Sequence, residues 1–478
     1  MPRYLIVGFL LLLQQISYAQ LDTNYKRQWL EIDSLYRYKG LPQSALSKVN
    51  ALYEKAEKDN KQAQVLKALL YKRILEQRFK SPSINDEVKD LQTEIQKTKI
   101  LEVQAILHTI LADKYFTYLQ YNRWRLYNRS KTIDFKKEDI ETWSADDFYQ
   151  AITAAYKNSL QHSPVLKKIS INKFEAILNL HSTNYYQQTL YDLLAHQALA
   201  YYKSDETYIT QPANRFIIKQ AEALGNISTF IHYNFTSVDT VPNKWKALLL
   251  YQDLLKFHQQ QKDTAALIDV NLDRIQYVKN HGTFANKDSL YKEALLHTAQ
   301  TFTNNRFAAD AWYLLAKHYA ESAQSYTPAG DSSKRFDYVK ALAITKRFIP
   351  LTDSTKGHYG LYNLHQSIFT TALQTKTEQV AAPALPLKAL IEYRNVKDLY
   401  YRVIEATKAV EDALKKLSIN NGRKRNLTIF SLAKSFAYIR QEKVPLPVTG
   451  DYQPHSVEIK IDPLPIGKGS IFISTECG

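Results

Sequence analysis

Residues 387–404 read LKALIEYRNVKDLYYRVI, and this stretch decides the fold class of the C-terminal part. Apolar and polar side chains alternate on both sides of a polar step near residues 394–398. The alternating apolar residues are Leu387, Ala389, Ile391 and Tyr393, followed by Leu399, Tyr401 and Val403. A period of two predicts two short strands around a polar turn, each with one buried face.

Upstream of this stretch, apolar residues recur at helical steps of three and four. After Lys39-Gly40-Leu41-Pro42, one such run covers residues 45–56, and a second covers 65–74 beyond the turn Asp59-Asn60. Pro42 suits the first turn of a helix, where its missing N–H costs nothing. The pattern predicts a helical hairpin, which needs stacked neighbours to bury its apolar stripes.

Further amphipathic helices are expected over residues 101–119, 145–160, 190–202 and 245–257. Ser144 is a candidate N-cap for the second of these. Trp312, Leu315, Ala316 and Tyr319 fit the first helix of a tetratricopeptide repeat, with a second helix over residues 338–348.

We therefore expect a mainly α fold: a tetratricopeptide-like array of helical hairpins over residues 20–375. Arrays of this type present a concave surface to a partner. A role of the array as a spacer or docking domain is an alternative to partner binding, and the sequence favours neither.

The first nineteen residues have the features of a secretory signal peptide. Arg3 provides a positive start, Leu5–Leu13 form the apolar run, and Ser17-Tyr18-Ala19 offers small residues for cleavage. The run is too short to span a bilayer, which takes about 20 residues. We expect a mature chain that starts at Gln20 and is exported to the periplasm, cell envelope or extracellular space. A lipoprotein would carry Cys at this position, so no lipid anchor is expected.

Charge and cysteine content narrow the class of protein. The formal net charge is +16, but basic residues are interleaved with acidic ones, and the densest run is Arg423-Lys424-Arg425. This distribution does not favour nucleic-acid binding. Cys477 is the single cysteine, so stability must come from cores rather than disulfides. A chain of 478 residues is too long for one core, so two or three domains are expected.

No motif for catalysis, cofactor binding or metal binding stands out, and we expect a protein that is not an enzyme. His196, His297 and His318 lie in helical patterns, where packed or rim positions are expected. The acidic pairs 146–147 and 411–412 lie near helix starts, where the helix dipole accounts for them. A hydrolase with an unusual acidic or histidine cluster stays open as an alternative.

Past a linker at residues 376–384, residues 385–478 are expected to form a β-sandwich. The stretch 408–426 is expected as a helical or loop insertion. Candidate strands follow at 427–432, 435–439, 457–461 and 471–474. The last of these ends close to the end of the sequence, which leaves an unpaired sheet edge. We therefore expect an incomplete sandwich, from a longer protein or a product cut short.

Three strings carry a resemblance to a known family: Lys39–Leu46 (KGLPQSAL), Tyr393–Val396 (YRNV) and His455–Gly467 (HSVEIKIDPLPIG). With them, essentially the whole mature chain resembles the N-terminal region of bacterial, Bacteroidetes-type α2-macroglobulin family proteins. The resemblance implies an N-terminal helical region followed by a first macroglobulin-like domain.

The family likeness implies the N-terminal portion of an exported, broad-spectrum peptidase inhibitor whose partners are proteases. In such inhibitors, cleavage of a bait segment triggers collapse around the protease, and some members capture it through a Cys-Gly-Glu-Gln thioester. The sequence contains neither part: Cys477 lies in Glu476-Cys477-Gly478, so no thioester role is expected for it. The alternative is an exported helical-repeat binding or adaptor module for a glycan or a protein. Gln20 argues against the lipidated, glycan-binding type.

Overall fold

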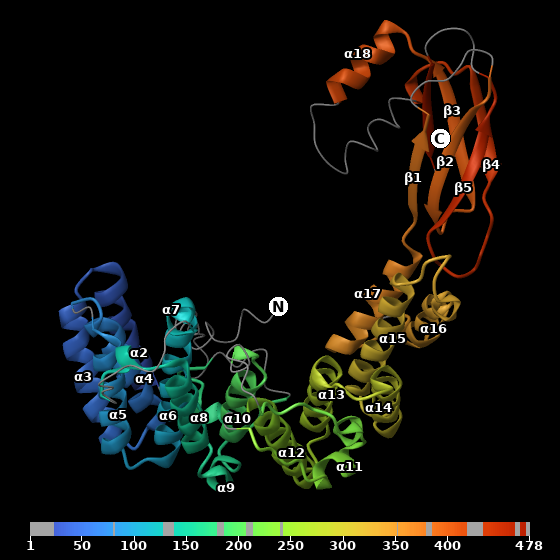
Figure 1. The fold of residues 1–478 in the computed structure, drawn as a ribbon. Helices are drawn as coiled ribbons and strands as arrows, with labels where there is room; N and C mark the ends of the chain where they lie inside the picture. Colours follow the sequence, from blue (N-terminus) through green and yellow to red (C-terminus); the bar gives the residue numbers. More distant parts are fainter. Residues whose placement is uncertain are drawn as a thin grey trace. The chain divides into compact units, whose positions relative to one another are not determined.

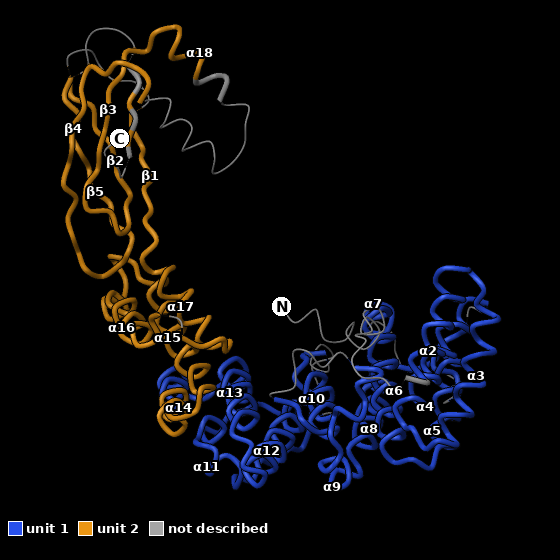
Figure 2. Tube along the Cα trace, turned by 180° about the vertical axis from the view of Figure 1, so that it is seen from behind, with its two compact units in different colours: residues 1–294 blue, residues 295–478 orange. Residues whose placement is uncertain are grey.

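The computed structural model is mainly helical, with antiparallel strands near the C-terminus (Figure 1). Two compact units divide the chain, residues 1–294 and residues 295–478 (Figure 2). The structure describes residues 23–79, 82–127, 138–178, 186–206, 214–239, 242–350, 352–378, 385–417, 434–463 and 469–474. The expected signal peptide, the basic run at 423–425, the candidate strand at 427–432 and Cys477 lie outside these ranges.

Unit 1 consists of successive α-helices. The helices are α2 (Thr23–Asp33), α3 (Pro42–Lys58), α4 (Gln62–Glu76), α5 (Ile84–Lys97), α6 (Leu101–Tyr121), α7 (Arg123–Tyr127), α8 (Ala145–Ser159), α9 (Ser163–Leu166), α10 (Leu190–Tyr202), α11 (Ile227–His232), α12 (Asn243–Gln261) and α13 (Thr264–His281). The boundary between the units falls within α14 (Lys287–Thr301). The helices expected in this part of the chain are confirmed as α3, α4, α6, α8, α10 and α12.

The hairpin of α3 and α4 follows directly from its sequence. Pro42 occupies the first turn of α3, as expected. Val49 and Leu52 are buried against α4, in one core cluster with Leu69. Asn60 takes a left-handed conformation (φ +54°) in the turn, which an asparagine tolerates better than most residues.

Capping boxes fix the starts of three helices in unit 1. The reciprocal pairs are Ser83 with Asp86 at α5, Ser144 with Asp147 at α8, and Thr189 with Asp192 at α10. Each satisfies backbone N–H groups that the helix itself leaves unpaired, and an N-cap of this kind contributes about 1 kcal/mol. The expected N-cap at Ser144 is thereby confirmed.

Unit 2 combines helices with a small two-sheet β-structure. Its helices after α14 are α15 (Ala308–Gln324), α16 (Asp337–Thr345), α17 (Lys356–Phe369) and α18 (Lys408–Leu417). Its strands are β1 (Ala372–Thr377), β2 (Leu387–Arg394), β3 (Asp398–Glu405), β4 (Arg440–Pro445), β5 (His455–Ile461) and β6 (Gly469–Ser474). They form two antiparallel sheets, β1-β2-β5 and β4-β3-β6.

The strands β2 and β3 have the faces that the sequence predicts. The alternating residues, from Leu387 to Tyr393 and from Leu399 to Val403, are all buried. The two strands belong to different sheets, so the polar turn carries the chain from one sheet to the other. The apolar faces of both sheets share one core cluster. We call this two-sheet structure the sandwich.

Two expectations about the boundaries of the sandwich are wrong. The helical part ends at Phe369, and β1 occupies residues that were expected as the end of the array and the start of the linker. Residues 435–439 do not form a strand, because β4 starts at Arg440. The strands β1 and β4 are exposed along most of their length, so neither has the apolar alternation that marks a half-buried strand.

Candidate functional site

The string Tyr393–Val396 ends the helix α17 with side-chain hydrogen bonds. The Asn395 amide Nδ2 donates to the carbonyls of Ile368 (2.6 Å) and Thr370 (3.1 Å). Arg394 donates from a terminal nitrogen to the carbonyl of Ile368 (3.3 Å). The last carbonyls of a helix have no partner within the helix, so these donors satisfy groups that would otherwise need water. The corner between β2 and β3 thus serves as the C-terminal cap of α17.

Arg394 also contacts two further segments. Its guanidinium lies over the ring of Tyr338 in α16, 4.6 Å from the ring centroid. Its Nε donates to the carbonyl of Tyr452, in the loop between β4 and β5 (2.9 Å). A planar guanidinium can stack and donate several hydrogen bonds at once, which a lysine cannot do. One side chain therefore connects the sandwich to α16 and α17.

Asp451, in the same loop, is a fully buried carboxylate with four donors. Its oxygens accept from Arg335 Nε (2.8 Å), Thr449 Oγ1 (2.7 Å) and the Gln453 backbone N–H (3.1 Å). His455 Nε2 lies 2.8 Å from one of them. Burial raises the pKa of Asp451, but the hydrogen bonds from His455 and Arg335 outweigh it and hold the pKa well below its usual range.

Gln453 completes the connection to the helices. Its Nε2 donates to the carbonyl of Ala323 in α15 (3.0 Å) and to the carbonyl of Arg335 (3.3 Å). We call the contacts of Arg335, Arg394, Asn395, Asp451 and Gln453 the joint. Each of these side chains pairs with a group on the other side, so the sandwich and α15–α17 are held together by directed bonds rather than by apolar contact alone.

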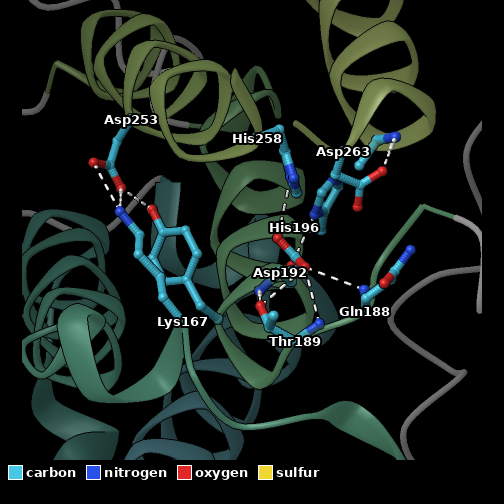
Figure 3. A network of polar contacts seen from close by, with 10 residues as sticks. Lys167, Gln188, Thr189, Asp192, His196, Asp253, His258 and Asp263 are labelled. Atoms are coloured by element: carbon cyan, nitrogen blue, oxygen red, sulfur yellow. Dashed lines mark hydrogen bonds and ion pairs between the residues drawn. The ribbon is translucent and has the colours of Figure 1, made fainter. Parts of the chain in front are cut away.

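Unit 1 contains a buried acid and histidine that resemble a catalytic pair (Figure 3). Asp192 Oδ1 and His258 Nε2 lie 3.2 Å apart, and each residue is 1% exposed. Asp192 Oδ2 accepts from the Thr189 hydroxyl and backbone N–H, as part of the cap of α10. No substrate can reach atoms that are this buried. The pair therefore contributes to the packing of α12 against the start of α10.

The residues around this pair are engaged in similar structural contacts. His196 Nδ1 lies 2.8 Å from the Asp192 carbonyl, one turn back on its own helix. Lys167 Nζ pairs with Asp253 at 3.0 Å (Figure 3). The Tyr191 hydroxyl donates to the same carboxylate. These bonds connect the segment after α9 to α10 and α12.

The other residues considered from the sequence lie apart from one another. His297 is in α14, near the Thr301 hydroxyl, and His318 is in α15 beside Tyr319. Asp147 belongs to the capping box of α8, and Glu411 lies in the first turn of α18. Within the described ranges, no group of three or more His, Cys, Asp or Glu residues could hold a metal ion.

The sequence singles out Tyr393–Val396, which supplies two residues of the joint, and His455–Gly467, which contacts Asp451, but it does not indicate these contacts. Arg335 lies in an insertion between α15 and α16, more than a hundred residues from Asp451, and no local pattern connects the two. The polar run before β5 carried the only available signal, since buried polar residues next to a strand need partners.

Neither the comparison with protein-family models nor the search of curated proteins finds a match for this chain. Among the helices that the structure describes, none is long and apolar enough to cross a membrane.

Proposed function

We propose that this chain is the N-terminal portion of an exported, non-catalytic peptidase inhibitor of the α2-macroglobulin type. One observation carries the proposal: of the three strings on which the family resemblance rests, one provides two residues of the joint and another contacts the joint residue Asp451. Tyr393–Val396 supplies Arg394 and Asn395, and His455 opens the third string and contacts Asp451. These contacts require particular polar side chains at these positions. Apolar core positions, by contrast, accept several residue types.

A joint of this kind suits a protein that works by collapsing around a protease. Neighbouring domains in one chain move relative to each other unless their interface is extensive or strongly bonded. In the joint, a buried carboxylate with four donors and a capped helix end oppose such motion. A domain that moves as one body with its supporting helices can transmit a displacement. The bait and capture residues would belong to other parts of the inhibitor.

The remaining parts of the proposal follow from the sequence. The signal-like segment at residues 1–19 supports export to the periplasm or cell envelope. The tetratricopeptide-like array would act as an appended spacing or docking module. Proteases would be the targets of the whole inhibitor, and no cofactor is needed for a steric trap.

A helical-repeat adaptor is the second candidate, and a groove in unit 1 favours it. A cavity of 630 Å³ lies between α4 and α5 and is lined mainly by charged and polar side chains, among them Arg73, Glu87 and Glu94. Grooves between helices of a repeat array are where such proteins receive partners. In this alternative the array, rather than the sandwich, determines what the protein does.

The genomic DNA downstream of codon 478 distinguishes the two candidates. If the inhibitor proposal is right, one of the three frames encodes further antiparallel sandwiches of similar length, with a bait segment among them. A stop codon followed by unrelated genes would contradict the proposal and leave the adaptor as the better account.

A further inference from the structure

A cavity of 360 Å³ lies beside the joint, between the end of α17, the corner after β2 and the loop before β5. Its apolar lining comes from Phe369, Tyr393, Val396, Pro447, Val448 and Tyr452. Tyr393 and Val396 are buried, whereas Val448 is 75% exposed and Phe369 is 45% exposed. The cavity therefore has a closed apolar floor and an open apolar rim.

Most polar groups of the lining already have hydrogen-bond partners. The Tyr393 hydroxyl donates to the carbonyl of Pro447 (2.9 Å), and the Gln453 and Asn395 amides donate to the helix carbonyls described above. These groups are fixed and cannot turn toward a sugar ring. The cavity is accordingly suited to an apolar group rather than a glycan.

One lining residue, Tyr452, holds a strained backbone conformation, with a φ of +59°. A left-handed conformation costs a residue with a bulky side chain about 1–2 kcal/mol, and such strain tends to occur at ligand-binding sites. The Tyr452 ring lies edge-to-face with Phe369 in this cavity, at 5.4 Å between centroids. The two rings thereby form one wall.

Lys397 supplies the charge that the cavity otherwise lacks. It is exposed, it belongs to the lining, and it forms no ion pair with a carboxylate of the described ranges. Of the two cations of the joint, Arg335 is paired with Asp451, and Arg394 donates to the backbone carbonyls of Tyr452 and Ile368. An apolar cavity with one lysine in its lining that forms no ion pair with the described residues complements a ligand that is apolar and carries one negative charge.

We propose that this cavity binds the C-terminal residue of a partner polypeptide, with an aromatic side chain in the cavity and the terminal carboxylate on Lys397. A volume near the lower limit of ligand cavities, about 300 Å³, suits one residue rather than a larger molecule. Terminal carboxylates are a recurring recognition element for protein partners. This inference goes beyond the inhibitor proposal and does not depend on it.

The test measures binding of a labelled peptide, Gly-Gly-Ser-Phe, by fluorescence anisotropy to the chain from Gln20 onward. We expect the free-carboxylate peptide to bind about tenfold more tightly than its C-terminal amide, because one charge-assisted hydrogen bond is lost in the amide. Lys397→Gln should reduce binding of the carboxylate to that of the amide. Lys388→Gln, an exposed lysine on β2, is the matched control and should change neither.

A second variant tests the apolar part of the site. Val448 is exposed, so Val448→Asp should fold normally and yet abolish binding of both peptides. Equal binding of carboxylate and amide, no effect of Lys397→Gln, or no binding at all would overturn the proposal. If 3-phenylpropionate binds as tightly as the peptide, the site is one for small acids and the assignment to a polypeptide C-terminus is wrong.

Discussion

Asp451 has no exposed surface, yet four donors keep its carboxylate charged. A buried charge is stable only while its partners are present, and loss of one partner from such a pair costs about 3–5 kcal/mol. Arg335, by contrast, keeps 39% of its side chain exposed and can return to water. Loss of Asp451 should therefore destabilise the joint more than loss of Arg335.

Asp451→Asn should lower the free energy of unfolding of unit 2 by about 3 kcal/mol at pH 7, because the amide loses the charge and presents donors to donors. Hydrogen exchange of the β5 amides in urea measures the effect. The matched control is Asp462→Asn, since Asp462 is 58% exposed and pairs with Lys460 only at 3.7 Å. Equal exchange rates in the two variants would contradict the assignment of Asp451 to the joint.

The stabilisation by Asp451 should also depend on pH. Its folded-state pKa lies below the usual value of 3.8, so the unfolded chain takes up the proton first as the pH falls. The contribution is complete at neutral pH and is lost progressively below about pH 4. The difference in stability between the wild type and Asp451→Asn should therefore shrink in acid. A difference that stays constant from neutral pH to pH 3 would argue against the pKa shift.

Lys67 is the opposite case, a buried cation without adequate partners. It is fully buried in α4, and its Nζ makes no hydrogen bond and lies 4.5 Å from the Trp29 ring centroid. Burial lowers the pKa of Lys67 to about 8, despite the opposing charge of Asp33. The cost of burying the charged ammonium group is therefore complete below about pH 8, and it disappears as the pH rises toward 10.5.

Lys67→Met should stabilise unit 1 by about 2 kcal/mol at pH 7, after the lost cation–π contact is deducted from the relieved charge burial. Thermal unfolding at pH 7 and at pH 10 measures the effect, which should be smaller at the higher pH. Lys89→Met, at an exposed position in α5, serves as control. Destabilisation by Lys67→Met would indicate that the charge of Lys67 supports the fold.

At the scale of the elements, Gly357 sets the approach of α17 to α15. A Cβ on Gly357 would lie 2.4 Å from the backbone of Ala309 and Asp310, which cannot move aside without shifting α15. Gly357→Ala should therefore destabilise unit 2 by about 3 kcal/mol, as overpacking does.

Gly360 is the matched control in the same helix. A Cβ there would meet the ring of Tyr313, at 2.6 Å, which is a contact with a side chain rather than with the backbone of a neighbouring helix. We expect Gly360→Ala to cost less than about 1 kcal/mol, because the gain in helix propensity offsets part of the contact. Urea denaturation of the two variants provides the comparison, and equal effects would contradict the packing account.

How far the elements were predictable from sequence depended on their burial. The helices α3 and α8 and the strands β2 and β3 bury one face, and their apolar period was visible. The strand β1 is exposed at nearly every position, so its period was hidden. Pairing with β2, which lies later in the sequence, determines it as a strand, and this is long-range information.

The joint was less predictable than the sandwich. The string Tyr393–Val396 supplies two residues of the joint, but a short string does not reveal which distant residues it contacts. Asp451 meets Arg335 across 116 residues of sequence, and Gln453 meets Ala323 across 130. Such contacts depend on how α15–α17 pack against the sandwich, and no pattern in a short stretch of sequence predicts them.

At the scale of the whole molecule, the compact units do not follow the change from helices to strands. The sequence suggested a division near residues 376–384, whereas the boundary between the units lies within α14. The reason is the joint, which makes α15–α17 and the sandwich one unit. In the proposed inhibitor, this unit would move as a single body when the trap closes.

The most direct test of the proposed function is a protection assay on the complete gene product that contains this chain. The product is incubated with trypsin, and digestion of casein is then compared with hydrolysis of a small chromogenic peptide. A protease enclosed by a trap keeps its active site but excludes large substrates. The account predicts that casein digestion falls while hydrolysis of the small peptide continues. Digestion of both substrates at the rate of free trypsin, or equal loss of both, would contradict it.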